Sequence, residues 1–437
     1  MSTPTPTRRG NAARRPAAIG IMLVGLTFAL LTLAGTTPLG IGRPVDDPPR
    51  VKLDERVFSC TGGLGADRVL SGNLDTGLAK NRTVRSKPLR IVADRTVARG
   101  AFAGQESVVG KKLAWVPCPE PHAEWWFAGG GSAEITHDTV LTITNPRPGA
   151  AVIDVDVYGD DGAVTAPGLH GITIGGRSTR VVDLGRSAPT SGNVAVSVIA
   201  SRGLVAVTAA DTFAPGLIGK KVQEWLPPQP APSKTLVLAG LPSKPGLAAL
   251  TLVNPGSTEA IAKLEVIGNH GTFSPEGLAP VTVPPESVTT LQIADVIDGS
   301  PMAIRITTDG RVTGTIRTTK AGDTSFATGV QALRDSTSFG LPQGTGRLVL
   351  SSLGEAGSVK VTGYDSRGHA VLTRTVAVEA GTSAAVKLTS QVRYVQLVAD
   401  RATVAGAFSM SPKNGIAAAG IAPAIRSTRL PAVRPGW

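Results

Sequence analysis

The residues best suited to chemistry in this chain are acids and histidines that lie on predicted strands and turns. Asp154 and Asp156 are two positions apart in an alternating stretch, so their carboxylates would share one face of a strand, as paired general acid and base groups require. A copy of this stretch 109 residues later has Lys263 and Glu265 at the same positions. Because the copy reverses one charge, the pattern indicates a solvated strand face and not a catalytic pair.

Metal binding and nucleophilic catalysis are not predicted either. The turn Asp160-Asp161-Gly162 offers carboxylate oxygens for calcium, but Asn269-His270-Gly271 replaces it in the copy, and one acidic dipeptide supplies too few ligands. The histidines have no metal-ligand spacing, and the sequence has no G-x-S-x-G elbow, phosphate-binding loop or dinucleotide fingerprint. We therefore expect no enzyme activity, no metal and no cofactor. The five histidines are His122, His137, His170, His270 and His369.

An aromatic cluster is the one stretch that suggests a ligand. Trp125, Trp126 and Phe127 are adjacent and precede three glycines, and alternate side chains on a strand face opposite sides, so at least one must face outward or fill a seam between units. Together with Trp115 they form a candidate ligand surface, on which an indole could stack against a sugar ring. The alternative is that they seal the junction of the first two repeat units. The corresponding core-like stretch Leu236 to Gly240 favours the alternative.

The chain has two cysteines, Cys60 and Cys118. In an exported protein two lone cysteines are expected to pair, and closing a loop of this length would stabilise the fold by roughly 3 to 4 kcal/mol. The other interpretation is two buried thiols. Two cysteines without histidines at ligand spacing cannot complete a tetrahedral zinc site.

The N-terminus predicts export. Residues 1–16 form a basic segment expected to stay in the cytoplasm, and residues 17–39 contain an uncharged apolar run that is either a transmembrane anchor or a signal peptide. The run is longer than the apolar core of most signal peptides, which favours an anchor. Residues 40–50 would form a short stalk. The rest of the chain would then lie outside the cell membrane, as a single-pass or secreted protein.

Composition and charge further restrict the structural class of the protein and its expected partners. Charged residues are 17% and aromatic residues 4% of the 437 residues, and glycine and proline are frequent, which suits short strands joined by tight turns. The net charge is +12, and no acid occurs before Asp46. A basic surface of this kind would attract anionic polymers weakly. Without a basic run or an aromatic-interleaved basic stripe, a nucleic acid is not an expected partner.

The sequence is built of repeats. Gly110 to Gly162 recurs as Gly219 to Gly271 at an offset of 109 residues, with Asn145-Pro146 matching Asn254-Pro255. A closing signature, a strand, a turn with a basic residue and a strand ending in Phe-Ala or Phe-Ser, occurs four times. Four copies of one folding unit are therefore predicted.

Each full unit is predicted to contain about seven short strands of alternating apolar and polar residues, which is typical of an antiparallel sandwich of immunoglobulin-like size. The fold class is therefore all-β, in tandem units after one N-terminal helix. Proline-rich linkers should act as stiff spacers and give a rod of separate units. The predicted boundaries are 51–121 for a truncated first unit, 122–228, 229–341 and 342–423 for the other three, and 424–437 for a flexible tail.

With Cys118-Pro119, Trp125 to Gly131 and Asn145-Pro146 in place, the chain resembles a family of uncharacterised actinobacterial exported proteins, each with a membrane-targeting N-terminus and a β-rich ectodomain. The likeness covers most of residues 50–425. It implies a cell-envelope setting. It transfers no catalytic residue, because the family has no assigned activity.

These observations favour a non-enzymatic extracytoplasmic scaffold or interaction protein of the cell envelope. Its expected partners are membrane or envelope proteins, or anionic cell-wall polysaccharide, with membrane attachment through the N-terminal helix. A carbohydrate-binding module that uses exposed tryptophans is the alternative.

Overall fold

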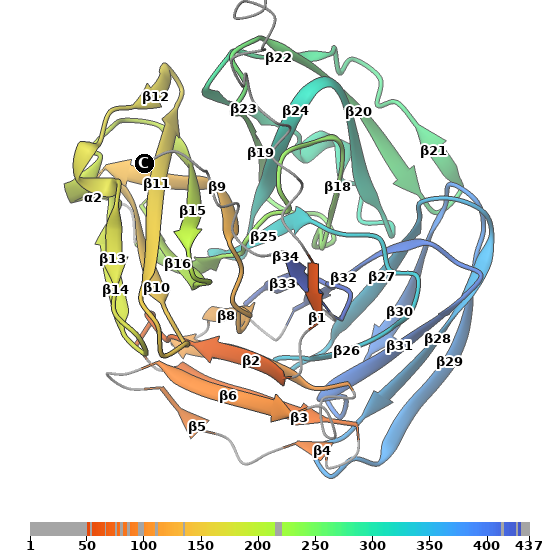
Figure 1. Cartoon of the computed structure of the whole chain (residues 1–437). Helices are drawn as coiled ribbons and strands as arrows, with labels where there is room; N and C mark the ends of the chain where they lie inside the picture. Colours follow the sequence, from red (N-terminus) through yellow and green to blue (C-terminus); the bar gives the residue numbers. More distant parts are fainter. Residues whose placement is uncertain are drawn as a thin grey trace, which may run out of the picture. The chain divides into compact units, whose positions relative to one another are not determined.

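A computed structural model describes residues 50–429, except 53–54, 66, 75–76, 79–81, 85–87, 95–99, 110–111, 134–135, 215–220, 412–414 and 425–426. The regular secondary structure of the described part is nearly all antiparallel strand, and α2 (Leu184–Ser187) is its one α-helix (Figure 1). The predicted helix in residues 17–39, the basic segment and all of the stalk but Arg50 fall outside it. Within the described residues, no helix has the length and apolar character needed to cross a membrane.

The first block of strands, β2 to β8, is held by the predicted disulfide. Its sheets are β2-β6 and β4-β3-β7-β8, with β5 paired to β3. Cys60 at the end of β2 bonds to Cys118 just after β8, which confirms the predicted pairing, and both lie in a small buried cluster with Phe58 and Val69. The strands are β2 (Glu55–Cys60), β3 (Asp67–Asn73), β4 (Gly77–Leu78), β5 (Arg82–Thr83), β6 (Leu89–Asp94), β7 (Phe102–Val109) and β8 (Lys112–Pro117).

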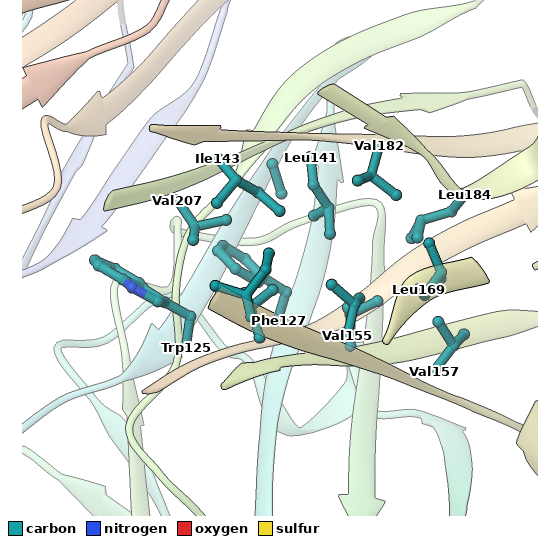
Figure 2. Close-up of a cluster of buried hydrophobic side chains, with 14 of the residues drawn as sticks. Trp125, Phe127, Leu141, Ile143, Val155, Val157, Leu169, Val182, Leu184 and Val207 are labelled. Carbon is teal, nitrogen blue, oxygen red and sulfur yellow. The ribbon is translucent and has the colours of Figure 1, made fainter. Parts of the chain in front are cut away.

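The second block, β9 to β17, has two antiparallel layers that β9 joins by pairing with both β15 and β10. The predicted alternation is confirmed along β11, where Ile153, Val155 and Val157 are buried and the residues between them are more exposed. They pack against Leu141 and Ile143 of the other layer (Figure 2). The strands are β9 (Glu124–Ala133), β10 (His137–Thr144), β11 (Ala151–Gly159), β12 (Gly162–Val164), β13 (Ile172–Ile174), β14 (Thr179–Asp183), β15 (Asn193–Arg202), β16 (Ala206–Phe213) and β17 (Val222–Leu226), with the 3-10 turn η1 (Pro167–Leu169).

The third block, β18 to β25, repeats the second, and even individual side-chain hydrogen bonds recur at equivalent positions. Asn254 donates through Nδ2 to the carbonyls of Thr258, Val283 and Pro284, and Asn145 makes the same three bonds at the equivalent positions of the second block. The repeated Asn-Pro dipeptide is therefore a structural corner. The elements are β18 (Ser233–Ala239), β19 (Leu247–Asn254), β20 (Ala260–Gly268), β21 (Gly271–Phe273), β22 (Val281–Val283), β23 (Ser287–Gln292), η2 (Ala294–Val296), β24 (Ala303–Lys320) and β25 (Asp323–Gly329).

The fourth block consists of two four-stranded sheets, β26-β31-β28-β29 and β30-β27-β32-β33. β26 lies within residues 229–341, yet it pairs with β31, so the predicted boundary at 341 must move to a position before Ser336. The strands are β26 (Ser336–Gly340), β27 (Gly346–Ser352), β28 (Gly357–Tyr364), β29 (Ala370–Val378), β30 (Ser383–Leu388), β31 (Tyr394–Asp400), β32 (Val404–Met410) and β33 (Ala417–Gly420).

The four blocks pack directly against one another, so the expected rod of separated units is wrong. Trp225 joins Leu64 and Val116 between the second and first blocks, and Trp126 joins Val253 between the second and third. Alanines of β32 meet β18 between the third and fourth blocks, and Trp115 of the first block lies in the core of the fourth. The proline-rich linkers fail as spacers because apolar side chains remain on the outer faces of the blocks and gain from burial there.

The ends of the described chain also meet. β1 (Arg50–Lys52) pairs with β34 (Ser427–Arg429), with Val51 opposite Thr428. Residues 427–429, predicted to belong to a flexible tail, therefore form a strand, because the first described residues supply the pairing edge that a local pattern does not show.

Candidate functional site

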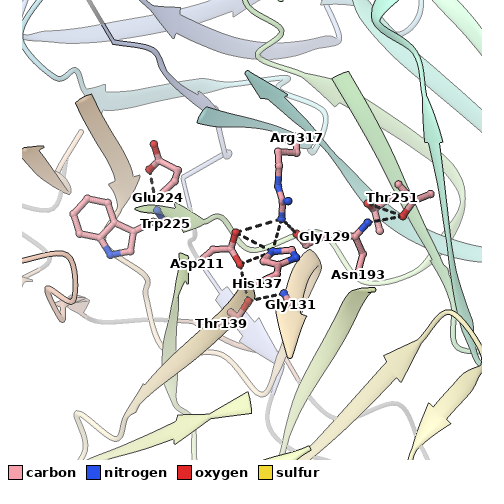
Figure 3. Close-up of polar contacts among 11 residues, drawn as sticks. Gly129, Gly131, His137, Thr139, Asn193, Asp211, Glu224, Trp225, Thr251 and Arg317 are labelled. Carbon is pink, nitrogen blue, oxygen red and sulfur yellow. Dashed lines mark hydrogen bonds and ion pairs between the residues drawn. The ribbon is translucent and has the colours of Figure 1, made fainter. Parts of the chain in front are cut away.

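A group of three ionisable side chains, Asp211, His137 and Arg317, is buried where the second and third blocks meet (Figure 3). We call it the ion cluster. Asp211 is on β16 and His137 on the neighbouring β10, whereas Arg317 comes from β24 of the third block. His137 Nε2 lies 3.0 Å from Asp211 Oδ1, and Arg317 Nη2 lies 3.3 Å from Asp211 Oδ2. Thr139 donates its hydroxyl to Asp211 Oδ1 at 2.7 Å.

Strand alternation puts Asp211 in this position. Val207, Ala209 and Asp211 follow one another at every second residue of β16, so they share one face of the sheet. All three are almost completely buried. The sequence thus places one carboxylate on an apolar face, and a buried carboxylate needs a charged or hydrogen-bonding partner.

Arg317 meets that need from the third block. Its Nη2 group also donates to the main-chain carbonyl of Gly129, and its guanidinium lies over the ring of Phe213 at 4.5 Å and near that of Phe326 at 5.5 Å. Its Nε has no hydrogen-bond partner among the described residues. The two rings replace part of the hydration that the cation loses.

The three glycines after the aromatic run form a wall of the ion cluster. Gly131 donates its main-chain N–H to the Thr139 hydroxyl at 2.9 Å. A Cβ at Gly131 would come within 2.3 Å of the His137 carbonyl oxygen, and one at Gly130 within 2.5 Å of the Thr139 hydroxyl. Gly129 has a φ of 84°, which few other residues adopt, and it presents the carbonyl that Arg317 binds. The glycines are required because the backbone of β9 passes so close to the cluster.

Burial and charge act in opposite directions on Asp211. Burial alone would raise the pKa of its carboxyl, but His137 and Arg317, with hydrogen bonds from His137 and Thr139, together lower the pKa below its usual value. Burial lowers the pKa of the Arg317 guanidinium, and Asp211 partly offsets this effect. The two side chains are therefore a buried ion pair at neutral pH.

The Nε2 atom of His137 is surrounded by protein groups. It lies 2.6 Å from Arg317 Nη2 and also within reach of both oxygens of Asp211. A deprotonated Nε2 accepts from Arg317, whereas a protonated one donates to Asp211. In either state the atom is occupied by protein groups. The deeply buried side chains of the cluster therefore connect the second and third blocks.

A second group, the carboxylate pair Glu224 and Asp323, binds the free edge of β8. Glu224 Oε1 accepts the main-chain N–H of Trp115 at 3.3 Å and that of Trp225 at 2.9 Å. Asp323 Oδ2 accepts the N–H of Leu113 at 3.2 Å and that of Ile416 at 2.9 Å. Since alternate N–H groups of β8 point away from β7, the two acids complete the hydrogen bonding of that edge. They connect β8 to the other three blocks.

Both acids of the carboxylate pair have raised pKa values. Burial, followed by the nearby Asp323, raises the pKa of Glu224 well above its usual value, against the opposing effect of the two N–H groups. Burial likewise raises the pKa of Asp323, although three main-chain N–H groups lower it in part. The pair therefore holds protons more tightly than exposed acids do.

The aromatic cluster does not form a ligand surface. Trp115, Trp125, Trp126 and Phe127 have exposed fractions of only 2%, 6%, 5% and 0%. Trp125 and Phe127 point into the core of the second block (Figure 2), and Trp126 lies against the third block, where it stacks on Tyr158. The candidate ligand surface is therefore not exposed, because neighbouring blocks cover the side that a single isolated unit would leave open, and the favoured interpretation of the aromatic residues as a seal between units fits their burial. Trp126, on the other face of β9, fills the contact between the second and third blocks and not the contact between the first and second.

Among the other residues considered for chemistry, only an exposed group on β11 and the following turn comes together in the described part of the chain. Asp154 and Asp156 lie near His170 at 3.9 and 4.0 Å on an exposed face. No group of three or more His, Cys, Asp or Glu in the described residues could hold a metal ion. A depression of about 620 Å³ is lined by Pro230, Leu236, Arg305 and their neighbours, and no member of the ion cluster or the carboxylate pair lines it.

Comparison with known proteins gives a family but no activity. No curated protein matches the chain. The structure of Streptomyces avermitilis alpha-L-rhamnosidase complexed with L-rhamnose aligns at 11% identity over 83% of this chain and 54% of that chain, with a TM-score of 0.12. The structure of infectious bursal disease virus Gx strain aligns at 9% identity over 90% of this chain and 88% of that chain, also with a TM-score of 0.12.

The chain spans about half the length of the rhamnosidase, and TM-scores this low support no conclusion from either alignment. The family model described as "Family of unknown function (DUF5719)" matches residues 79–389, which run from the first block to the end of β30 in the fourth and make up more than half of the chain. The chain therefore belongs to this family of unknown function.

Proposed function

We propose that the chain is a non-enzymatic scaffold or interaction protein outside the cell membrane. The observation that supports this most directly is the use of its buried ionisable groups. Asp211, Arg317, Glu224 and Asp323 are all bound to groups of other blocks or of the main chain. Side chains that could perform chemistry are thus used to hold four blocks as one body, which leaves extended outer surfaces for partners.

The location rests on two further points. The Cys60–Cys118 disulfide is buried, and stable disulfides are typical of proteins in oxidising compartments. The basic and apolar N-terminal residues, which lie outside the described part, suit an anchor or export signal. In this proposal the blocks are immunoglobulin-like units of an actinobacterial envelope protein, and the partners are membrane or envelope proteins or anionic wall polysaccharide.

Location is tested by labelling an Asp161→Cys variant in intact cells with a maleimide that cannot cross membranes. Asp161 is exposed in the β11–β12 turn, and the native cysteines are paired, so only the new thiol should react. We expect equal labelling in intact and lysed cells. Labelling only after lysis would contradict an extracytoplasmic position, and labelling of the unmodified chain serves as the background.

Function is tested by crosslinking the full chain in intact cells and identifying what it captures. We expect a small, reproducible set of envelope proteins. Turnover of a wall glycan by the purified chain that is lost in an Asp211→Asn variant of unchanged fold would contradict the proposal and assign catalysis to the ion cluster.

A further inference from the structure

The strand β29 (Ala370–Val378) is an exposed edge of the fourth block. It pairs with β28 along its whole length, and no strand in the described part of the chain pairs with its other side. Six of its nine residues are exposed, including Val371 at 40%. Figure 1 shows it at the rim of the fourth block, with β28 inside it.

The equivalent edges of the second and third blocks are interrupted. β11 is covered by two three-residue strands, β12 and β13, with Pro167 and Gly168 between them, and β20 is covered by β21 and β22, with Pro275 and Pro280 between them. Short strands and prolines are the usual means of preventing unwanted strand pairing at an edge. β29 has neither proline nor glycine, and five of its residues are valine or threonine. Of three equivalent edges, this one alone is left able to accept another strand.

Charge limits what can pair there. Arg374 is exposed at the centre of β29, and Lys360 is exposed on β28 opposite Thr375. Neither has an ion-pair partner within the described structure. Glu379 follows the strand, beyond the paired residues. Because Arg374 is opposite Val361, it lies on the other face of the sheet from Lys360. An added strand would therefore meet the positive charge of Arg374 at the middle of this edge.

This charge disfavours the chain itself as the occupant. Two copies of β29 in full antiparallel overlap would place Arg374 opposite Arg374, and like charges directly opposite each other are destabilising. The chain before Asp46 has basic residues but no acid, so it offers no complementary strand either. An acidic strand from another protein has no such penalty.

We propose that β29 is a docking edge for an extended acidic peptide segment of a partner protein, which adds to the β26-β31-β28-β29 sheet as a fifth strand. Main-chain hydrogen bonds to β29 give the affinity, and a carboxylate opposite Arg374 sets the register. This inference rests on the proposed function, since it names the surface through which an interaction protein would bind.

The test uses the purified full chain and a labelled synthetic peptide with alternating glutamate and valine. Fluorescence polarisation should show saturable binding, and hydrogen exchange should slow in residues 370–378. Arg374→Glu should weaken binding by at least about tenfold, since a favourable cross-strand pair becomes a repulsive one. The same variant should bind the corresponding lysine and valine peptide more tightly than the unmodified chain does.

Lys263→Glu is the control, because it makes the same change of charge at an exposed base on β20, beneath the interrupted edge of the third block. It should leave peptide binding unchanged, and far-UV circular dichroism should show that all variants are folded. Equal loss in both variants would overturn the inference by showing attraction to general positive charge. Concentration-dependent dimerisation of the chain through β29, or an unchanged exchange rate in residues 370–378, would overturn it as well.

A crosslinking comparison separates this inference from the proposed function. A photoreactive residue at Thr373 should capture a partner, whereas one at Thr282 on the interrupted edge of the third block should not. Capture only at other surfaces would refute the docking edge and leave the scaffold function intact. Wall-glycan turnover by the chain would refute the scaffold function whatever the peptide does.

Discussion

Glu224 of β17 accepts the main-chain N–H of Trp115 in β8, so a side chain of the second block completes the sheet edge of the first. Asp323 of the third block performs the same task two residues earlier on β8, at Leu113. The acids thus protect an edge that would otherwise be open to another strand. By contrast, β29 has no such cover in the described structure.

The raised pKa of Glu224 predicts a pH-dependent difference in stability. The pKa of Glu224 is higher in the native state than in the unfolded chain. The bound proton therefore stabilises the fold fully at pH values below the unfolded-state pKa, and this stabilisation is lost as the pH rises through the native pKa. Glu224→Gln keeps the acceptor oxygen and removes the titration. The variant should therefore gain stability relative to the unmodified chain as the pH rises from about 5 to neutral pH, as measured by urea unfolding.

Glu224→Ala is the companion variant. It leaves the N–H groups of Trp115 and Trp225 without their acceptor, and a buried unsatisfied donor costs roughly 1 to 3 kcal/mol. Glu224→Ala should destabilise the fold at both ends of this pH range. Identical pH profiles for the unmodified chain and Glu224→Gln would show that the carboxyl of Glu224 does not hold a proton in the native state.

The ion pair between Asp211 and Arg317 predicts a large cost of removing one partner. Asp211→Ala leaves a cation buried without its counter-charge, so the free energy of unfolding should fall by roughly 3 to 5 kcal/mol. Asp161→Ala, at an exposed turn, should change it by less than about 0.5 kcal/mol. The double variant Asp211→Ala/Arg317→Met should recover part of the loss, and no recovery would mean that Arg317 is not stabilised by Asp211.

The local parts of this arrangement are predictable from the sequence, whereas the contacts between blocks are not. The alternation in β11 and the pairing of Cys60 with Cys118 follow from short-range pattern and from cysteine count. Asp211 could have been singled out as well, because it continues the apolar face that Val207 and Ala209 begin. No local pattern, however, indicates that Arg317, 106 residues further along the chain, will face it.

The aromatic run shows the same limit. Strand alternation correctly implies that Trp125 and Trp126 face opposite sides, and it favours a seam between units for one of them. Which block would cover Trp126 depends on how the blocks pack, and that packing is determined by many weak apolar contacts spread over several strands. The repeats in the sequence indicate the number of units and not the faces through which those units meet.

The burial of Trp126 predicts a structural effect and no ligand effect. Trp126→Ala removes a large side chain from the seam with the third block and from its hydrogen bond to Glu124, so it should cost roughly 3 to 5 kcal/mol of stability. Adding wall polysaccharide should not shift the tryptophan fluorescence of the unmodified chain. Phe273→Ala, at a side chain that is 53% exposed, is the control and should cost little. A stable Trp126→Ala variant that lost a polysaccharide-induced shift would restore the carbohydrate hypothesis.

The close approach of β9 to the ion cluster predicts that Gly131 cannot be replaced even by alanine. The added methyl would overlap the main-chain oxygen and the ring of His137, and backbone so confined by neighbouring strands cannot move aside. We expect Gly131→Ala to lower the free energy of unfolding by roughly 1 to 3 kcal/mol. Gly149→Ala is the matched control, because nothing lies within 4 Å of a Cβ there and its φ is not positive. In urea unfolding Gly149→Ala should be neutral or slightly stabilising, since alanine restricts the unfolded chain more than glycine does. Equal stability of the two variants would mean that β9 does not pass as close to His137 as the structure places it.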